Sequence, residues 1–282
     1  MGCSDKKAVF FDLDGTIWDW RRNIPESTVY TIKKLKENGH NVLLCSGRAR
    51  GNIRAQKVVD LGFDGIVAAC GGYVEIGGKV LDNFLIPKDV VKLTVDTINE
   101  CRMPVVLEGP KKHWISDWGF ENDSFVAFMR EDMKKDAVSF SKYSKNMEIN
   151  KFSADVLGVT DYGKIKKQLE FYYKFIEHGI TPDFAEKKKT DDSLDICGVI
   201  EATPLGISKA VGVRKACEYL GVKIENTYGI GDSVNDIDLF ECVAHSICMG
   251  NGAEKAKEAA EYVTTDIQEN GIYNAMKHYE LI

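Results

Sequence analysis

The chain has 282 residues, with 43 acidic against 37 basic side chains and a formal net charge of −6. This length exceeds what one hydrophobic core usually organises, so we expect one domain with a large insertion. The acidic balance argues against a nucleic-acid partner, because phosphate backbones attract basic proteins. Small anionic substrates remain compatible with it, since a local lysine or a metal ion outweighs the overall field.

Eight cysteines occur without a Cys-x-x-Cys pair and without the spacing of zinc ligands. Several lie inside apolar runs, such as Asn41 to Cys45, which favours buried, reduced thiols and a cytoplasmic location. No apolar run is long enough to span a membrane, and the first residues lack the apolar core of a signal peptide. We therefore expect no membrane partner.

The first predicted element is the apolar run Ala8 to Phe11, which leads into Asp12, Asp14 and Gly15. A short apolar run closed by glycine predicts a buried strand that ends in a turn. Asp12 and Asp14 are two residues apart, so on a strand their carboxylates share a side. The pair is compatible with an aspartate turn that caps its own backbone. It is equally compatible with a site for a hard cation such as Mg²⁺, with one carboxylate free to react.

Strands and helices then alternate up to residue 83. The patterns predict a helix over Pro25 to Asn38, a strand over Asn41 to Cys45 that ends at Ser46-Gly47-Arg48, a helix over Arg50 to Leu61 and a strand over Gly65 to Ala69. A small hairpin, Tyr73 to Ile76 with Lys79 to Leu81, follows. This alternation predicts a parallel sheet covered on both faces, with ligands bound beyond the carboxyl ends of its strands.

The alternation loosens over residues 84 to 193, which we expect to form an inserted α+β domain. The patterns there predict a helix over Lys88 to Cys101, strands over Val105 to Leu107 and His113 to Ser116, a helix over Ser124 to Met133, a strand over Ile149 to Phe152, a helix over Tyr162 to Glu177 and a strand over Asp183 to Glu186. The catalytic core would then comprise residues 1 to 83 and 194 to 282.

The alternating pattern returns in the second core segment. It predicts strands over Leu194 to Ile200, Thr227 to Ile230, Val243 to Cys248 and Tyr262 to Thr264, and helices over Leu205 to Leu220, from Ser233, over Ala253 to Ala260 and over Gly271 to Tyr279. The predicted fold class is α/β, a doubly wound parallel-sheet core with an inserted α+β domain.

Polar residues stand at several of these strand ends and helix starts. Ser46, with Gly47 behind it, could hold an anion through its hydroxyl and through backbone N–H groups, or could simply cap a helix. Lys209 falls in the first turn of a predicted helix, where the macrodipole disfavours a cation by about 0.3–1 kcal/mol. That unfavourable position points to a role in binding phosphate, although an exposed, solvated lysine is the alternative.

The run Gly231 to Asp236 ends a strand and opens a helix. Asp232 at the strand end is the natural third acidic ligand of a metal ion. Asp236 stands three residues after Ser233, which is the spacing of a capping box. The alternative is that its carboxylate orients metal-bound water. Asn235 is placed to bind phosphate or to fix a neighbouring carboxylate.

Together these groups fit phosphoryl transfer, which needs a nucleophile, an acid or base, a metal and a cation. Asp12 would attack phosphorus and become an aspartyl-phosphate. Asp14 would protonate the leaving oxygen and then take a proton from the water that hydrolyses the intermediate.

The ordered motifs DLDGT (12 to 16), CSGR (45 to 48), ISKA (207 to 210), GDSVND (231 to 236) and MGNGA (249 to 253) resemble those of the haloacid dehalogenase superfamily. The large insertion resembles its Cof-type, subclass IIB phosphatases. The resemblance implies a Rossmann-like core with a C2 cap, Mg²⁺ as cofactor and small phosphorylated metabolites as substrates.

Residue by residue, the resemblance implies Asp12 as nucleophile and Asp14 as acid/base and backbone metal ligand. It implies Ser46 and Lys209 as phosphate binders and Asp232 as magnesium ligand, supported by Asn235 and Asp236.

Two segments depart from the family pattern. Family members often have Asn-Gly after the third strand, whereas this chain has Cys70-Gly71-Gly72. The segment Trp18-Asp19-Trp20 is unusually aromatic, and we expect it to pack at the hinge of the cap. Two other functions remain open on the sequence: a phospho-acceptor or ligand-sensing module without turnover, and a phosphomutase of the same superfamily.

Overall fold

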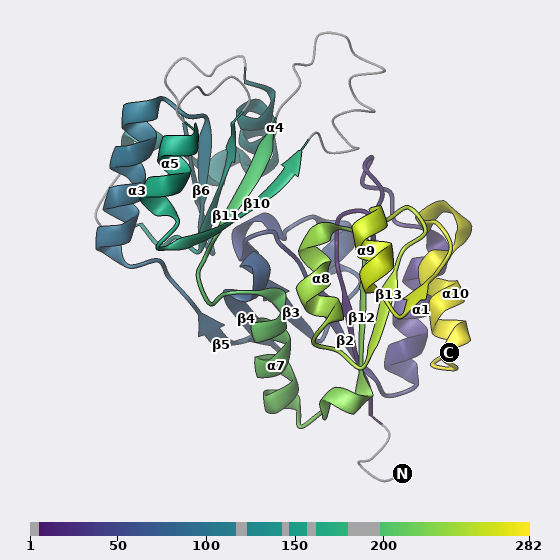
Figure 1. Ribbon diagram of the computed structural model, residues 1–282. Coiled ribbons are helices and arrows are strands. Elements are labelled where there is room, and N and C mark those ends of the chain that lie inside the picture. Colours follow the sequence, from purple (N-terminus) through teal and green to yellow (C-terminus); the bar gives the residue numbers. More distant parts are fainter. Residues whose placement is uncertain (1–5, 117–122, 143–146, 157–161, 180–197) are drawn as a thin grey trace. The chain divides into compact units, whose positions relative to one another are not determined.

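The computed structural model describes residues 6–116, 123–142, 147–156, 162–179 and 198–282 (Figure 1). Contacts between residues divide the chain into two compact units. The core unit comprises Met1–Arg48, Arg54–Asn83 and Ile207–Ile282, and the cap unit comprises Ala49–Ile53 and Phe84–Gly206. The cap unit thus extends past residue 193, the limit expected from the sequence, and includes a short strip from the first core segment.

An eight-stranded sheet organises the described residues of the core unit. Its order is β14 (Tyr262–Val263), β13 (His245–Cys248), β12 (Thr227–Gly231), β1 (Ala8–Phe11), β2 (Asn41–Cys45), β3 (Gly65–Ala68), β4 (Tyr73–Ile76), β5 (Lys79–Asn83). Strands β14 to β3 are parallel, as predicted, and the hairpin β4–β5 extends the sheet in antiparallel fashion.

The first strand lies at the centre of this sheet. Phe11 is opposite Leu44 of β2 on one side and Ile230 of β12 on the other. All four residues of β1 are fully buried, which explains its continuous apolar sequence. Because the three strands are parallel and in register, their carboxyl ends meet at one edge of the sheet.

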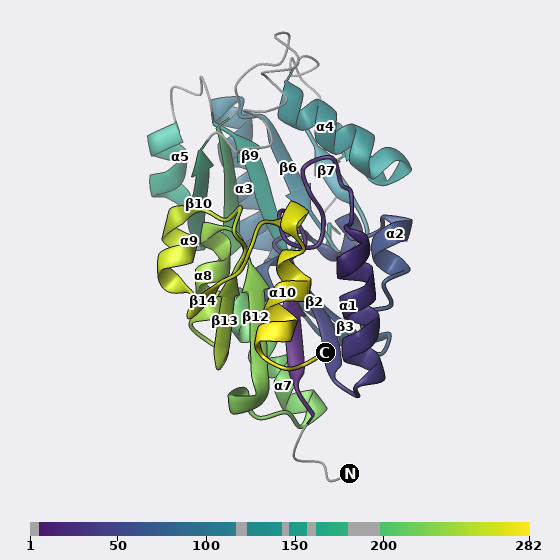
Figure 2. The same ribbon diagram turned by 90° about the vertical axis from the view of Figure 1, so that its right-hand side faces the viewer.

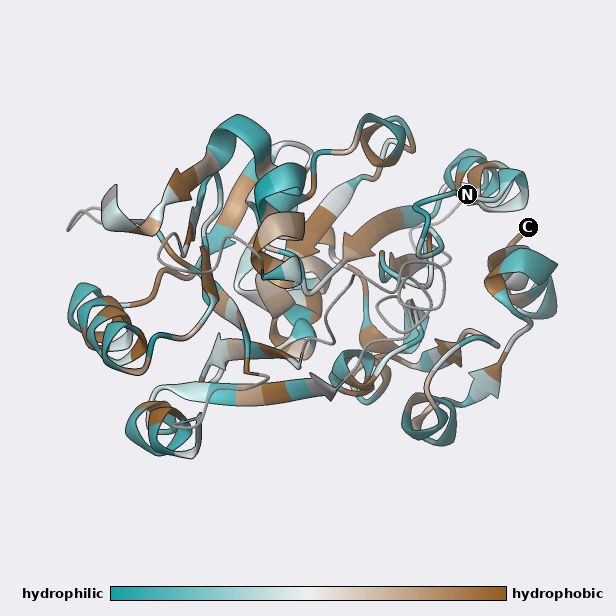
Figure 3. Cartoon of the chain, turned by 90° about the horizontal axis from the view of Figure 1, so that it is seen from above, coloured by the Kyte–Doolittle hydropathy of each residue, from teal (hydrophilic) through white to brown (hydrophobic). Residues whose placement is uncertain are grey.

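Helices cover both faces of the core sheet (Figure 1). Helices α7 (Lys209–Leu220), α8 (Ile237–Phe240) and α9 (Glu254–Ala259) contribute to one apolar cluster with Phe10, Leu43 and Val67. Helices α1 (Glu26–Glu37) and α10 (Gly271–His278) contact each other on the opposite face and lie side by side in Figure 2. In Figure 3 helices seen nearly end-on carry both hydrophobic and hydrophilic residues, as expected of helices that cover a sheet. The predicted doubly wound arrangement is confirmed.

Two core helices differ from their predicted limits. The helix expected over Arg50 to Leu61 is wrong: a 3₁₀ turn, η1 (Arg50–Asn52), and a short helix, α2 (Gln56–Val59), take its place. Gly51 disfavours a continuous helix, and a Cβ there would lie 2.9 Å from the carbonyl oxygen of Gly109. Helix α7 begins at Lys209 rather than at Leu205, because the side chain of Ser208 caps it by accepting from Val211 N.

A six-stranded sheet organises the described residues of the cap unit. Its order is β10 (Tyr173–Gly179), β11 (Val199–Pro204), β9 (Lys151–Asp155), β6 (Val105–Glu108), β7 (His113–Ile115), β8 (Ala137–Ser139). Helices α3 (Lys88–Cys101) and α5 (Tyr162–Leu169) contribute to the main apolar cluster on one face, and α4 (Ser124–Met133) packs with Val106 and Ile115 on the other. The unit therefore has its own core, as expected of an α+β insertion.

Two predictions in the cap unit are wrong. The helix expected over Tyr162 to Glu177 ends at Leu169, and β10 follows, because Tyr173 and Phe175 alternate onto the apolar cluster. The strand expected over Leu194 to Ile200 was assigned to the core, whereas β11 pairs with β9 and β10 of the cap sheet. The strand expected over Asp183 to Glu186 lies outside the described residues.

Buried charges occupy the face of the cap sheet opposite the main apolar cluster. Lys151 Nζ lies 2.8 Å from Glu201 Oε2 and 3.6 Å from Glu108 Oε1. Glu108 Oε1 also accepts a hydrogen bond of 2.5 Å from Ser153 Oγ. A single buried lysine thus connects two glutamates on different strands.

Candidate active site

The structure brings the predicted site residues to the carboxyl edge of the core sheet. Asp12 and Asp14 follow β1, Ser46 and Gly47 follow β2, and Asp232 follows β12. Asn235 and Asp236 lie in the 3₁₀ turn η6 (Val234–Asp236), and Lys209 is the first residue of α7. All of them belong to the core unit.

Lys209 lies at the centre of the site. Its side chain is only 1% exposed, and its Nζ donates to Asp12 Oδ1 at 2.6 Å and to Asp236 Oδ1 at 2.5 Å. Asn235 Oδ1 lies 3.4 Å from the same nitrogen. The alternative of an exposed, solvated lysine is therefore excluded, and the cost of a cation at a helix start is offset by two carboxylates.

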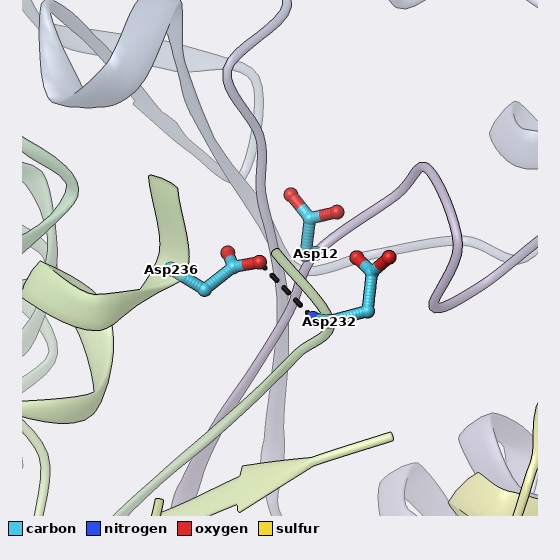
Figure 4. Close-up of side chains that lie close together, drawn as sticks. All are labelled: Asp12, Asp232 and Asp236. Atoms are coloured by element: carbon cyan, nitrogen blue, oxygen red, sulfur yellow. Dashed lines mark hydrogen bonds between the residues drawn. The ribbon is translucent and has the colours of Figure 1, made fainter. Parts of the chain in front are cut away.

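Asp236 accepts hydrogen bonds at both of its carboxylate oxygens. Its Oδ2 accepts from the backbone N–H groups of Asp232 at 3.1 Å and Ser233 at 3.0 Å, which completes a capping box (Figure 4). Its Oδ1 accepts from Lys209. The capping-box reading is confirmed, and Asp236 also fixes the backbone of Asp232 and the ammonium of Lys209. That it orients metal-bound water stays a prediction.

Three carboxylates converge at the site. One oxygen from each of Asp12, Asp232 and Asp236 lies within 4.8 Å of the others. In Figure 4 the carboxylates of Asp12 and Asp232 point in the same direction. Since Asp236 is already engaged by Lys209 and by backbone N–H groups, Asp12 and Asp232 form the pair best able to share a cation. Carboxylate oxygens are the ligands that Mg²⁺ prefers.

The pKa values show that the site needs more positive charge than Lys209 supplies. Burial raises the pKa of Asp12 to about 8, with Asp236 and Asp14 adding to the effect and Lys209 opposing it. Burial and the charges of Asp12 and Asp236 likewise raise the pKa of Asp232 well above its usual value. A divalent cation between the two would restore both ionised forms, so the residues present fit Mg²⁺.

Two groups beside the carboxylates are held in their protonated forms. Although burial opposes the ammonium, Asp12 and Asp236 raise the pKa of Lys209 well above its usual value, so it stays a cation. Burial also raises the pKa of the nearby Cys45 thiol well above its usual range, so this cysteine stays protonated. Neither the ammonium of Lys209 nor the thiol of Cys45 is therefore in a nucleophilic form.

Two glycines of the motifs make this close approach sterically feasible. A Cβ on Gly15, whose φ is +75°, would lie 2.1 Å from Asp232 Oδ2. A Cβ on Gly231 would lie 2.4 Å from Asp236 Cγ. Both contacts are far shorter than van der Waals distance, so the spacing of the acidic groups depends on glycine at both positions.

Ser46 directly follows β2, the strand beside β1. It is buried, its N–H donates to Val67 O at 2.8 Å, and its hydroxyl accepts from Arg48 N at 3.2 Å. The hydroxyl thus stabilises the turn Ser46–Arg48 at the carboxyl end of β2. The same turn places Gly47 and its backbone N–H at the edge where an anion would bind.

Sequence reasoning missed two residues that contact Asp14. Arg48 Nε lies 2.6 Å from Asp14 Oδ2, and a terminal guanidinium nitrogen of Arg48 lies 2.9 Å from Asp14 Oδ1. Trp18, expected to pack at the hinge of the cap, donates its indole N–H to Asp14 Oδ1 at 2.9 Å. Burial opposes ionisation of Asp14, yet Arg48 and Trp18 hold its pKa below the usual value. The available sequence signal was an arginine shortly after β2, the strand that lies beside β1 and so close to the two aspartates.

Comparison with known protein families identifies the family to which this chain belongs. The family described as haloacid dehalogenase-like hydrolase matches residues 9–276. The chain belongs to this family. A relative in Bacillus subtilis (strain 168), YkrA, whose name describes a phosphatase, is 30% identical over 284 residues, which is 99% of each chain. The resemblance to the haloacid dehalogenase superfamily inferred from the motifs is therefore confirmed.

Another relative from the same bacterium is the 5-amino-6-(5-phospho-D-ribitylamino)uracil phosphatase YitU. It is 26% identical to this haloacid dehalogenase-like hydrolase over 289 residues, which is 96% of each chain. The structure is also similar to a hypothetical protein from Geobacillus kaustophilus HTA426 (TM-score 0.81, 26% identity, 98% and 100% of the two chains). The fold matches that of the subclass IIB sugar phosphatase BT4131 (TM-score 0.77, 23% identity, 98% and 100%).

Within the described ranges, no helix of this hydrolase combines the length and the apolar character needed to cross a bilayer.

Proposed function

We propose that this haloacid dehalogenase-like hydrolase is a Mg²⁺-dependent phosphatase of small phosphorylated metabolites, such as sugar phosphates and similar phosphomonoesters, that works through an aspartyl-phosphate on Asp12. The observation that carries the proposal is the contact of 2.6 Å between Asp12 and the buried ammonium of Lys209, beside the carboxylate of Asp232. A buried nucleophile, a fixed cation and a second anionic ligand are what phosphoryl transfer requires.

In the first step an oxygen of Asp12 attacks phosphorus. The bond from phosphorus to the ester oxygen breaks, the new Asp12–phosphorus bond forms, and Asp14 donates a proton to the leaving oxygen. Lys209 compensates the charge of the phosphoryl group, with Ser46, Gly47 and Asn235 as further phosphate contacts. The products of this step are an alcohol and the aspartyl-phosphate.

In the second step water attacks the same phosphorus. Asp14, now ionised, accepts a proton from that water, the Asp12–phosphorus bond breaks and inorganic phosphate is released. Bound Mg²⁺ would neutralise carboxylate and phosphoryl charge; its ligands would be Asp12, Asp232 and the backbone carbonyl of Asp14, with Asp236 as a supporting carboxylate.

The substrate class follows from the composition of the chain and from its relatives. The acidic net charge disfavours nucleic-acid partners. The name of the relative YitU describes a phosphatase of a phosphorylated small metabolite. Such metabolites are cytoplasmic, in agreement with the reduced cysteines expected from the sequence. We accordingly propose a cytoplasmic location and a small-molecule partner.

Phosphate release from a panel of phosphomonoesters tests the proposal. Wild type is compared with Asp12→Asn, each in Mg²⁺ and in EDTA. We expect release in Mg²⁺ from wild type alone, with a loss of at least about 10³-fold in the variant, because the amide is a poor nucleophile. Asp19→Asn is the matched control, and this variant should retain activity. Asp19 accepts hydrogen bonds from the side chains of Asn23 and Gln268, away from the three clustered carboxylates.

Other outcomes identify the remaining candidates. A stable phospho-Asp12 with no phosphate release would replace the proposal with an acceptor or sensing module. Isomerised phosphorylated product without free phosphate would identify a phosphomutase.

A further inference from the structure

The carboxylate of Asp14 combines exposure with a fixed orientation. Its side chain is 44% exposed, yet three donors hold it: two nitrogens of Arg48 and the indole N–H of Trp18. The two contacts from Arg48 reach different oxygens, which is the bidentate geometry that fixes a carboxylate plane. An exposed aspartate without such contacts would exchange between rotamers.

Trp18 is itself buried among cationic side chains. The residue is 2% exposed, and the cationic heads of Arg22, Arg48 and Lys57 lie 5.4–5.5 Å from the centroid of its ring. The backbone folds back between Leu13 and Trp18, since Trp18 N donates to Leu13 O and Trp18 O accepts from Gly15 N. The indole is thereby returned to the carboxylate four residues earlier.

Arg48 connects Asp14 to the turn that carries Ser46. The Arg48 side chain is 16% exposed, its N–H donates to Ser46 Oγ at 3.2 Å, and its carbonyl accepts from Ala69 N at 2.8 Å. Because these hydrogen bonds fix the backbone of Arg48, its guanidinium holds Asp14 at a defined position relative to the turn at the end of β2.

The distribution of donors distinguishes the two oxygens of Asp14. Among the described residues, Oδ1 accepts from both Arg48 and Trp18, whereas Oδ2 accepts from Arg48 alone. A carboxylate has about four acceptor positions, so Oδ2 keeps the one that remains, and that position holds the proton in the acid form. We propose that Arg48 and Trp18 are positioning residues for Asp14, which they hold so that Oδ2 meets the leaving oxygen of the substrate. This inference rests on the proposed phosphatase function.

The predicted consequence depends on the leaving group. An alkyl phosphate needs protonation of its leaving oxygen, whereas p-nitrophenyl phosphate releases a stable anion and needs little. Loss of one hydrogen bond to a charged group is equivalent to about 10–100-fold. Trp18→Phe and Arg48→Gln should therefore lower kcat on the best alkyl phosphate by about 10–100-fold, and on p-nitrophenyl phosphate by less than about threefold. Arg48→Lys should recover only part, because an ammonium lacks the fork.

Matched variants and a double-mutant cycle complete the test. Trp20→Phe and Arg21→Gln change an indole and a guanidinium that contact each other, and both should retain wild-type kcat on both esters. In an Asp14→Asn background, Trp18→Phe should cause no further loss on the alkyl ester, because it acts through Asp14.

Each result decides a different question. Equal losses on both esters, or additive losses with Asp14→Asn, would show a merely structural role and overturn the inference while the phosphatase function stands. Unchanged kcat in folded Trp18→Phe and Arg48→Gln would also overturn it. A folded wild type that releases no phosphate from any ester, including p-nitrophenyl phosphate, would overturn the proposed function and this inference with it.

Discussion

Lys209 illustrates how one buried side chain serves both stability and chemistry. It is the cation between Asp12 and Asp236, and both carboxylates are as buried as the lysine itself. Removing one member of a buried ion pair leaves charge that neither water nor a partner solvates. The same residue that would bind the phosphoryl group therefore allows two acidic residues to remain inside the fold.

We expect Lys209→Met to lose at least about 10²-fold in kcat and to be destabilised by about 3–5 kcal/mol in the absence of metal. Lys215→Met on the same helix is the control, because its ion pair with Asp82 is partly exposed to solvent and worth about 0.2–1 kcal/mol. Urea unfolding and phosphate release measure the two effects. A Lys209→Met protein as stable as Lys215→Met would contradict the expected role of the ion pair.

At the scale of elements, the start of α7 depends on a glycine from another loop. The 3₁₀ turn η2 (Ala69–Gly71) follows β3, and a Cβ on Gly71 would lie 1.9 Å from the carbonyl oxygen of Ser208, the residue that caps α7. The next residue is Lys209. A side chain at position 71 would therefore displace the helix start that positions the cation of the site.

We expect Gly71→Ala to reduce kcat by about tenfold or more as well as to destabilise the fold, because Lys209 moves with the helix start. Gly77→Ala is the matched control. The φ of Gly77 is positive, at +56°, but a Cβ at this position would meet nothing within 4 Å. It should cost only about 1 kcal/mol from backbone strain and leave kcat unchanged. Equal kcat in the two variants would refute the steric argument.

The elements also show what a sequence can and cannot predict here. The strands of the core sheet and their parallel arrangement follow from apolar runs and alternation, and the glycines and acidic residues at their ends locate the site. The segment Glu170–Glu177 has aromatic residues at a spacing compatible with helix or strand, and only packing of Tyr173 and Phe175 decides for a strand. The contacts of Arg48 and Trp18 with Asp14 depend on side-chain directions across a loop, which no spacing rule gives.

At the scale of the whole molecule, two units with separate apolar clusters should differ in their response to mutation. Lys151→Met removes the buried cation that contacts Glu108 and Glu201 in the cap sheet, and we expect a loss of about 3–5 kcal/mol in that unit. Lys166→Met, which breaks an exposed pair with Glu177, is the control. Hydrogen exchange should increase in β6 and β9 and not in β1 or β2. Increased exchange in both sheets would indicate one cooperative unit instead.

The pH dependence of stability should reveal the charge deficit of the site. In the metal-free protein the pKa of Asp12 is raised to about 8, against about 3.9 for an unfolded aspartate. The folded state then binds this proton more tightly, so its contribution to stability is present at low pH and is lost as the pH rises from about 4 to 8. We expect the Tm in EDTA to fall over this window more steeply for wild type than for Asp12→Asn.

Added Mg²⁺ competes with protons for the same carboxylates, so it should raise the Tm of wild type more near pH 8 than near pH 5.5. Asp232→Asn should reduce this metal-induced shift. A metal-free Tm that rises with pH equally in wild type and Asp12→Asn would show that Asp12 does not carry a raised pKa.

The position of β1 between β2 and β12 has a consequence for synthesis on the ribosome. Strands β1 to β5 emerge together and can pair as five of the eight strands described in the sheet, but β12 is made only after the entire cap unit. Until then the apolar strand β1 is an open edge, with backbone groups that can pair with another chain. The nascent chain is therefore most prone to aggregate while its cap is being made, and the site is completed only when Lys209 and Asp232 have both emerged.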